Sequence, residues 1–169
     1  KCLGAPSGLA PIAFAPAALE RRVQCRSFYL DVSLLQDYWI GRKYHHTMCT
    51  SLIYALREAL LMVEEEGLPA RLARHERHHR ALAAGVEAMG LSLLPPESER
   101  LWTLNTVRVP AGVDEAAVRR TLLTTYNIEV GAGLGPLTGR IWRVGLMGAS
   151  STPQTLLQLL AALEGALGM

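Results

Sequence analysis

The chain has 169 residues, of which 50% are hydrophobic and 19% are charged. This composition is typical of a globular protein, and the length accommodates one or two small domains. The 17 basic and 15 acidic residues nearly cancel, which argues against a dedicated nucleic-acid-binding protein, because such proteins carry a strong basic excess. The cysteines, Cys2, Cys25 and Cys49, lack the paired spacing of a metal site and are typical of a reducing compartment.

The N-terminal stretch imitates a secretory signal, because residues 3–19 carry no charge and follow a lysine. Prolines at positions 6, 11 and 16 interrupt this stretch, so we do not interpret it as a signal. No apolar run is long enough to span a bilayer, and we expect no membrane partner. The chain begins with Lys1 rather than Met, which indicates a processed protein or a fragment.

The first third of the chain predicts short elements separated by glycine and proline. We expect a loop over residues 1–8, a buried strand at Leu9–Phe14, a helix from Pro16 to about Gln24 and a helix from about Asp31 to Ile40. The clearest helix runs from about Met48 to Glu66, with Thr47 as a candidate N-cap and Gly67 as its end. Apolar residues recur on one face of it at helical spacing: Leu52, Leu56, Leu60 and Val63.

The second part of the chain changes its periodicity after Gly90. A helix with an apolar stripe precedes that glycine, starting near Pro69. We then expect strands at Leu91–Leu94 and Leu104–Val109, a helix capped by Asp114 to about Tyr126, strands at Ile128–Val130 and Ile141–Leu146, and a last helix opened by Thr152. This order predicts a compact α+β domain over residues 68–169. Residues 1–67 lack a matching sheet and resemble the tail of a larger domain.

A zinc-hydrolase pattern, His-Glu-x-x-His, falls at His75–His79 on a predicted helix. Such a helix places two histidines one turn apart as ligands and uses the glutamate as a base. Arginines surround the pattern and oppose a dication, and no obvious third ligand follows. We therefore interpret it as a solvated amphipathic helix face and expect no metal; the nearby glutamates argue equally against a nucleic-acid patch.

The segment Tyr44-His45-His46-Thr47 directly precedes the strongest predicted helix. A helix N-terminus offers free N–H groups and a positive dipole end, which attract phosphate. The hydroxyls of Tyr44 and Thr47 can add hydrogen bonds to the same anion. From these residues alone, simple helix capping beside surface histidines is the preferred interpretation.

Arg143 lies inside an apolar strand, between Trp142 and Val144, after a glycine-rich stretch over residues 131–139. The glycines permit a close backbone turn. An arginine in such a strand needs a partner, and a carboxylate matches its planar fork. The alternatives are a structural salt bridge and a binding site for a carboxylate ligand.

Taken in order, these stretches resemble the class V pyridoxal-phosphate aminotransferases of the alanine–glyoxylate/serine–pyruvate type. Residues 1–8 resemble the family segment that begins at the lysine holding the cofactor, and Tyr44–Thr47 matches its Tyr-His-His-Thr motif. Residues 133–148 resemble its Gly-Leu-Gly-Pro…Gly-Lys-x-x-Arg-Ile-Gly-Leu-x-Gly signature, with Arg140 in place of lysine and Val144 in place of isoleucine. Phe28–Asp31 and Leu56–Leu60 also match, so the resemblance covers the whole chain.

The resemblance implies an α/β fold of the fold-type-I transferase class. Residues 1–67 would then be the end of the large cofactor-binding domain with a long connecting helix, and residues 68–169 the small α+β C-terminal domain. The site residues it implies are Lys1 as cofactor anchor and catalytic base, Tyr44 and Thr47 as phosphate ligands across a homodimer interface, and Arg143 as the clamp for the substrate α-carboxylate. The implied cofactor is pyridoxal 5'-phosphate.

The activity implied by the resemblance is transamination between alanine or serine and a 2-oxo acid, glyoxylate or pyruvate. The machinery expected upstream of Lys1 is absent from these residues, so we expect the 169-residue piece alone to be inactive. A class V transaminase of the phosphonate or hydroxykynurenine type and a non-catalytic dimerisation fragment are the alternatives. We expect a cytoplasmic protein, with peroxisomal and mitochondrial locations left open.

Overall fold

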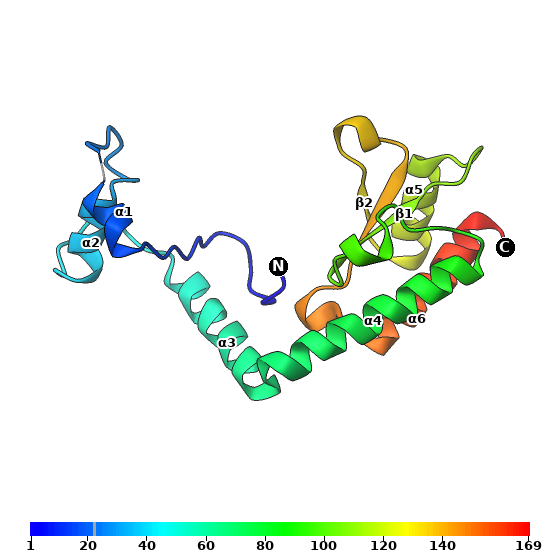
Figure 1. The fold of residues 1–169 in the computed structure, drawn as a ribbon, viewed down its shortest axis with the longest axis horizontal. Helices are drawn as coiled ribbons and strands as arrows, with labels where there is room; N and C mark the ends of the chain where they lie inside the picture. The colour runs from blue at the N-terminus through cyan, green and yellow to red at the C-terminus, as the bar shows by residue number, and fades with distance from the viewer. Residues whose placement is uncertain (22) are drawn as a thin grey trace. The chain divides into compact units, whose positions relative to one another are not determined.

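The structure is a computed structural model that describes residues 1–21 and 23–169. It divides into two compact units, one formed by residues 6–57 and the other by residues 1–5 together with residues 58–169 (Figure 1). Helix α3 (Thr50–Glu66), the predicted connecting helix, contributes residues to both units. The predicted domain boundary after residue 67 stays a prediction.

The unit formed by residues 6–57 contains α1 (Pro16–Glu20), α2 (Val32–Trp39) and the first turns of α3. The prediction of a strand at Leu9–Phe14 is wrong, because these residues adopt no regular secondary structure. A strand needs a neighbour for its backbone hydrogen bonds, and residues 6–21 and 23–57 provide no strand to pair with. The predicted end of the first helix at Gln24 is also wrong, since α1 ends at Glu20; residue 22 lies outside the described residues.

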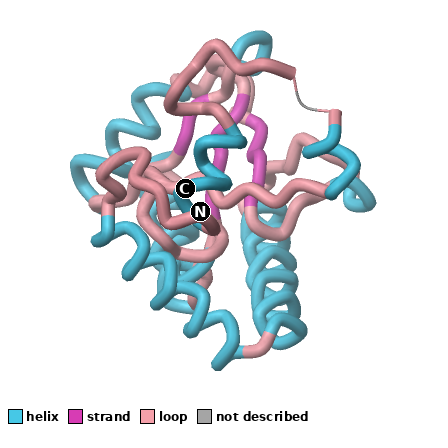
Figure 2. Tube along the Cα trace, turned by 90° about the vertical axis from the view of Figure 1, so that its left-hand side faces the viewer, coloured by secondary structure: helices cyan, strands magenta, loops and turns pink. Residues whose placement is uncertain are grey.

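The second unit is an α+β domain, as predicted for this part of the chain. Its antiparallel sheet has the order β1-β3-β2, with β1 at Leu104–Arg108, β2 at Gly131–Ala132 and β3 at Ile141–Gly145 (Figure 2). The expected strand at Leu91–Leu94 is reduced to one bridge between Leu93 and Val107, and the expected strand at Ile128–Val130 is wrong because β2 starts only at Gly131.

Three helices complete this domain: α4 (Leu68–Ala88), α5 (Glu115–Tyr126) and α6 (Pro153–Leu167). Helix α6 packs against both α4 and α5 (Figure 1). The predicted caps are confirmed: the Asp114 carboxylate accepts hydrogen bonds from the N–H groups of Ala116 and Ala117, and the Thr152 hydroxyl accepts one from Thr155 N–H. No described helix has both the length and the hydropathy needed to cross a bilayer.

The core of the domain lies between the helices and one face of the sheet. Its fully buried members come from every layer: Leu82 and Val86 of α4, Val107 of β1, Leu122 of α5 and Trp142 of β3. Because side chains alternate along a strand, Trp142 and Val144 point into this core, whereas Arg143 belongs to the opposite face of the sheet.

Candidate functional site

Lys1 begins a tight turn in the larger unit, and its side chain is exposed. The backbone N–H of Gly4 donates to the carbonyl oxygen of Lys1 (2.9 Å), and Gly4 has a φ of +81°, which favours glycine. The next carbonyl oxygen, that of Cys2, accepts a hydrogen bond from Arg71 (2.8 Å). The backbone that carries Lys1 is therefore held in place while its amine stays accessible.

Tyr44 and Thr47 are brought together by a hydrogen bond between their hydroxyl groups, 3.0 Å long. Both side chains are exposed, Tyr44 to 76%. The prediction that Thr47 caps the following helix is wrong: α3 begins at Thr50, and the first carbonyl to accept from the helix is that of Cys49. Freed from capping, the Thr47 hydroxyl can bind an anion jointly with the Tyr44 hydroxyl.

His45 fixes this segment from behind, and the expectation of surface histidines is wrong for it, since it is 7% exposed. Its ring stacks on Phe28 at a centroid distance of 4.5 Å, and its Nε2–H donates to the Phe28 carbonyl oxygen (2.9 Å). In a neutral His45 ring, which carries one N–H, Nδ1 is then the acceptor for Nδ1–H of His46 (2.8 Å). The sequence stretches at residues 28–31 and 44–47 are thus packed on each other.

Arg143 lies on β3 between Thr106 of β1 and Gly131 of β2 in the sheet register, and its side chain is half-buried. Its Nε–H donates to the carbonyl oxygen of Ala132 (2.7 Å). No carboxylate among residues 1–21 and 23–169 forms an ion pair with it. The structural salt bridge, one of the two readings of Arg143, therefore has no partner in the part of the chain described.

The glycine-rich stretch before β3 brings the backbone into close contact with itself. A Cβ atom added at Gly133 would overlap the carbonyl oxygen of Leu137 and lie 2.9 Å from Ile141 Cγ1. Gly133 follows Ala132, whose carbonyl oxygen accepts from Arg143. The glycine at this position thus permits the tight loop that positions the Ala132 carbonyl, the acceptor of the hydrogen bond from Arg143.

The His-Glu-x-x-His pattern lies on α4, but the interpretation as a solvated face is wrong. His75, His78 and His79 are 4%, 4% and 5% exposed. Nδ1–H of His75 donates to the Arg71 carbonyl oxygen (2.8 Å), and its Nε2 accepts from Gly148 N–H (3.1 Å). Both ring nitrogens are therefore engaged in the fold. Within the described part of the chain, no group of three His, Cys, Asp or Glu side chains is arranged to hold a metal ion.

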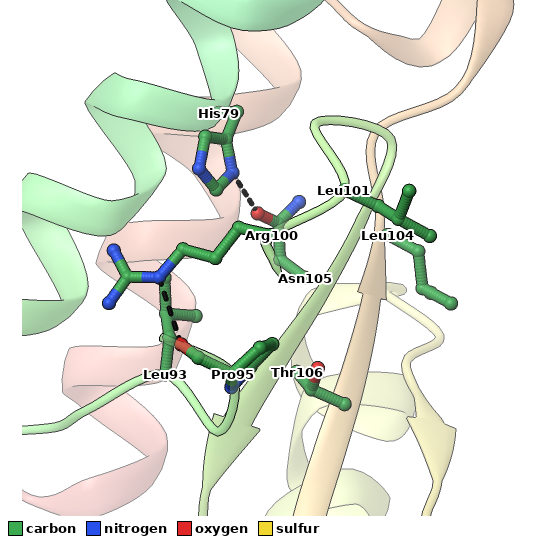
Figure 3. Close-up of a pocket in the computed structure, with 8 residues that line it drawn as sticks. All are labelled: His79, Leu93, Pro95, Arg100, Leu101, Leu104, Asn105 and Thr106. Atoms are coloured by element: carbon green, nitrogen blue, oxygen red, sulfur yellow. Dashed lines mark hydrogen bonds between the residues drawn. The ribbon is translucent and has the colours of Figure 1, made fainter. Parts of the chain in front are cut away.

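His79 also has a structural partner, because it forms a hydrogen bond with Asn105 of β1 (Figure 3). Its Nδ1 lies 2.6 Å from Asn105 Oδ1, which makes Nδ1 the donor, and both side chains are buried. Burial also lowers the pKa of His78, helped by the nearby positive charge of Arg77, which favours the neutral ring that contacts the Ser151 hydroxyl (2.9 Å). Periodicity alone does not reveal these partners, because they come from distant parts of the sequence.

The predicted site residues are distributed over both units. Lys1 and Arg143 belong to the unit of residues 1–5 and 58–169, whereas Tyr44 and Thr47 belong to the unit of residues 6–57. The hydrogen bond between Tyr44 and Thr47 joins two of the four. The roles of all four residues stay predictions.

Comparison with curated proteins identifies clear relatives, although no protein-family model matches the chain. The (S)-ureidoglycine–glyoxylate transaminase of Bacillus subtilis is 40% identical over 190 residues, which cover 99% of this chain and 46% of that protein. The alanine–glyoxylate aminotransferase of Drosophila melanogaster is 38% identical over 176 residues, again 99% of this chain and 45% of that protein. The chain thus spans about half the length of the curated relatives it matches.

Solved structures give the same result for the fold. The alanine–glyoxylate aminotransferase of a Nostoc species superposes with a TM-score of 0.95 at 46% identity, over 99% of this chain and 46% of that one. The pyridoxamine–pyruvate aminotransferase of Mesorhizobium loti superposes with a TM-score of 0.90 at 33% identity, over 99% and 44%. The resemblance proposed from the sequence is confirmed: the chain is homologous to the C-terminal portion of the class V, fold-type-I pyridoxal-phosphate aminotransferases.

Proposed function

We propose that the protein to which this chain belongs is a pyridoxal-phosphate-dependent aminotransferase that moves an amino group between alanine or serine and glyoxylate or pyruvate. Relatives named for glyoxylate or pyruvate as a substrate, at 33% to 46% identity in solved structures, support this reaction class. The support from this chain itself is local chemistry: an accessible lysine, a hydroxyl pair suited to phosphate, and an arginine suited to a carboxylate.

The observation that carries the proposal is the free edge of Arg143. Its Nε is used by the Ala132 carbonyl, and the rest of the guanidinium has neither a carboxylate nor a carbonyl partner among the described residues. A substrate α-carboxylate can accept two parallel N–H···O bonds from that edge, which fixes its orientation as well as its position. Because β3 pairs with a strand on each side, its backbone holds Arg143 rigidly in position for such binding.

The residues present fit the chemistry of the proposed cofactor. The exposed hydroxyls of Tyr44 and Thr47 lie 3.0 Å apart and can both donate to one phosphate, and the neighbouring Arg42 and Lys43 add positive charge. Lys1 presents an exposed amine, which fits the anchor. The three cysteines are free, which accords with the proposed cytoplasmic location.

When bound, pyridoxal phosphate supplies an electron sink that makes the substrate Cα–H acidic. Lys1 would hold the cofactor, and its Nζ, when not bonded to the cofactor, would accept the substrate Cα proton. Arg143 binds the substrate α-carboxylate, which orients the substrate Cα–H bond toward the Lys1 amine. Tyr44 and Thr47 hold the phosphate of the neighbouring subunit's cofactor, which makes a homodimer with shared sites part of the proposal.

We further propose that the 169-residue piece alone is inactive. Large apolar side chains of residues 6–57 are exposed in it, among them Phe14 at 47%, Trp39 at 62% and Ile40 at 75%. Such surface is typical of an interface that other parts of a protein cover. Transamination by the purified piece would contradict this proposal.

Labelling with borohydride tests the cofactor assignment directly, because Lys1 and Lys43 are the only lysines in the sequence. The full-length gene product is reduced with its cofactor, digested, and searched by mass for a phosphopyridoxyl group. We expect the label on Lys1. Label on Lys43 would retain the cofactor but refute the roles of Tyr44 and Thr47, and a full-length protein without label on any lysine would refute the aminotransferase.

The amino donor requires a separate experiment, because the relatives differ in the donors for which they are named. Alanine, serine, ureidoglycine and pyridoxamine are each offered with glyoxylate and with pyruvate, and phosphonate and hydroxykynurenine donors serve as the alternative set. Turnover dominated by the alternative set would retain the reaction class and refute the proposed substrates. Absence of turnover with every donor, in a folded protein, would favour a non-catalytic dimerisation module.

A further inference from the structure

Arg71 of α4 connects that helix to the backbone next to Lys1. The side chain is 10% exposed, and its guanidinium donates hydrogen bonds to two partners. Nη1 donates to Oε2 of Glu66 (2.8 Å), while Nη2 donates to the carbonyl oxygen of Cys2 (2.8 Å). Because Cys2 directly follows Lys1, this hydrogen bond fixes the backbone from which the side chain of the proposed cofactor anchor extends.

The next turn of α4 holds a second segment, the turn over residues 147–151 that follows β3. Nη1 of Arg74 donates to the carbonyl oxygens of Gly148 (3.1 Å) and Ser151 (2.6 Å). Nε2 of His75 accepts from Gly148 N–H (3.1 Å). Since β3 carries Arg143, the same helix face holds the two stretches of chain that bear the proposed base and the proposed carboxylate clamp.

The two segments also touch each other at Gly148. A Cβ atom on that residue would lie 3.1 Å from Cys2 O and 3.1 Å from Gly4 N, tighter than ordinary contacts. Gly148 has a φ of +59°, so a glycine is favoured here for conformational reasons as well. The turn that contains Lys1 is therefore fixed from two sides, by Arg71 and by the backbone at Gly148.

Glu66 keeps both arginines in place. Nε and Nη2 of Arg74 donate to its two carboxylate oxygens (2.5 and 2.9 Å), in the bidentate geometry that fixes a guanidinium plane. The hydrogen bond from Arg74, together with that from Arg71, lowers the pKa of Glu66 from 4.5 to about 2. The carboxylate is therefore ionised at neutral pH and holds both guanidinium groups firmly.

We propose that Arg71 is a positioning residue for Lys1: through the Cys2 carbonyl it sets the placement of the Lys1 amine relative to Arg143. This inference rests on the proposed function, because it assumes that Lys1 is the cofactor anchor and base. In this role Arg71 acts only through the backbone and does not contact substrate or cofactor.

The variant Arg71→Met in the full-length protein tests the proposal, with Arg80→Met as the matched control. Arg80 lies on the same helix, its side chain is 77% exposed, and its partner is Glu76 rather than the Lys1 turn. Proton transfer is sensitive to displacements of an ångström, so we expect Arg71→Met to lower kcat by about 10- to 100-fold. The KM for the amino acid should change by less than about 3-fold, because Arg143 and its anchor are retained.

Hydrogen exchange in the cofactor-free protein provides a readout that is independent of activity. We expect faster exchange in peptides that cover residues 2–5 in Arg71→Met, and no change there in Arg80→Met. If Arg71→Met fails to fold, Gly148→Ala is the second variant, because its added Cβ would press on Gly4 and on the Cys2 carbonyl oxygen that accepts from Arg71. It should lower kcat and increase exchange over residues 2–5 in the same way.

The outcomes separate this inference from the proposed function. Phosphopyridoxyl label on Lys1 in the unmodified protein, with Arg71→Met indistinguishable from Arg80→Met in kcat and in exchange, would overturn the positioning role alone. An unchanged kcat in Gly148→Ala would overturn it as well. Absence of label on Lys1 in the unmodified protein would overturn this role, and absence of label on every lysine would overturn the proposed function as well.

Discussion

A methyl group at Gly133 should disturb both the stability of the α+β domain and the Arg143 clamp. The added Cβ would overlap the Leu137 carbonyl oxygen and lie 2.5 Å from the Leu137 carbonyl carbon. Real Cβ atoms essentially never come closer than 3.0 Å, so the carbonyl carbon would have to move by at least about 0.5 Å. Backbone cannot move aside as the end of a flexible side chain can. We therefore expect a loss near the upper end of the range for overpacking, about 3 kcal/mol.

Gly135→Ala is the matched control for this variant, because it adds the same methyl group to the same loop. Nothing lies within 4 Å of a Cβ at Gly135, and its φ of +54° makes conformational strain the only cost. That strain amounts to about 1 kcal/mol. The two glycines thus separate a steric cost from a conformational one, and Gly133→Ala should be about three times as destabilising.

Thermal unfolding of the full-length protein, followed by circular dichroism, measures the comparison, and the KM for the amino acid measures the clamp. We expect a clearly larger fall in melting temperature for Gly133→Ala, and a raised KM in that variant alone, because its neighbour Ala132 supplies the carbonyl that orients Arg143. A melting temperature for Gly133→Ala equal to or above that of Gly135→Ala would refute the reasoning from backbone contact.

Three further predictions concern the clamp, the α4 ion pairs and the core. Arg143→Lys should raise the KM for amino acid and oxo acid by about 10- to 100-fold, because an ammonium cannot form the bidentate pair, whereas exposed Arg140→Lys should leave steady-state kinetics unchanged. The pKa of Glu66 is lowered from 4.5 to about 2, so its contribution to stability is present above pH 4.5 and lost as the pH falls through about 2. The difference in melting temperature between the unmodified protein and Glu66→Gln should therefore shrink over that pH range. A constant difference would contradict the prediction. Leu82→Ala should cost about 2–5 kcal/mol in chemical denaturation because Leu82 is 0% exposed, against less than about 1 kcal/mol for Leu157→Ala at 66% exposure.

The helices and the central strand of the α+β domain could be predicted because their signals are local. The last helix shows it: Thr152 caps it and Gly168 ends it in a left-handed conformation, both within one turn of the residues they affect. The strand with Arg143 was predicted to run to Leu146 and ends at Gly145. The prediction of a strand at Leu9–Phe14 failed because strand formation is not a local property. An apolar run becomes a strand only where another strand pairs with it.

The site residues could be proposed from the sequence only through family resemblance, and the physical cause is the sequence separation between partners. Arg143 is orientated by Ala132 across the sheet, and His45 is buried by Phe28 from an earlier loop. Neither contact follows from periodicity, which reports on neighbours along one helix or strand. The Tyr44–Thr47 hydrogen bond is local, but helix capping was the wrong interpretation of Thr47 because α3 begins only at Thr50.

The polar face of α4 illustrates how such separation misleads a sequence-based argument. A helix that is rich in arginine and histidine is expected to face solvent, because burying these groups without partners is costly. Here the partners exist, on segments more than sixty residues away: His75 binds Gly148 N–H, and Arg71 binds the Cys2 carbonyl. Both ring nitrogens of His75 pair with backbone groups, and Arg71 pairs with the Cys2 carbonyl and the Glu66 carboxylate. A hydrophobic face would have packed the same segments with less directional control, whereas hydrogen bonds to named backbone atoms specify where Lys1 and β3 lie relative to the helix.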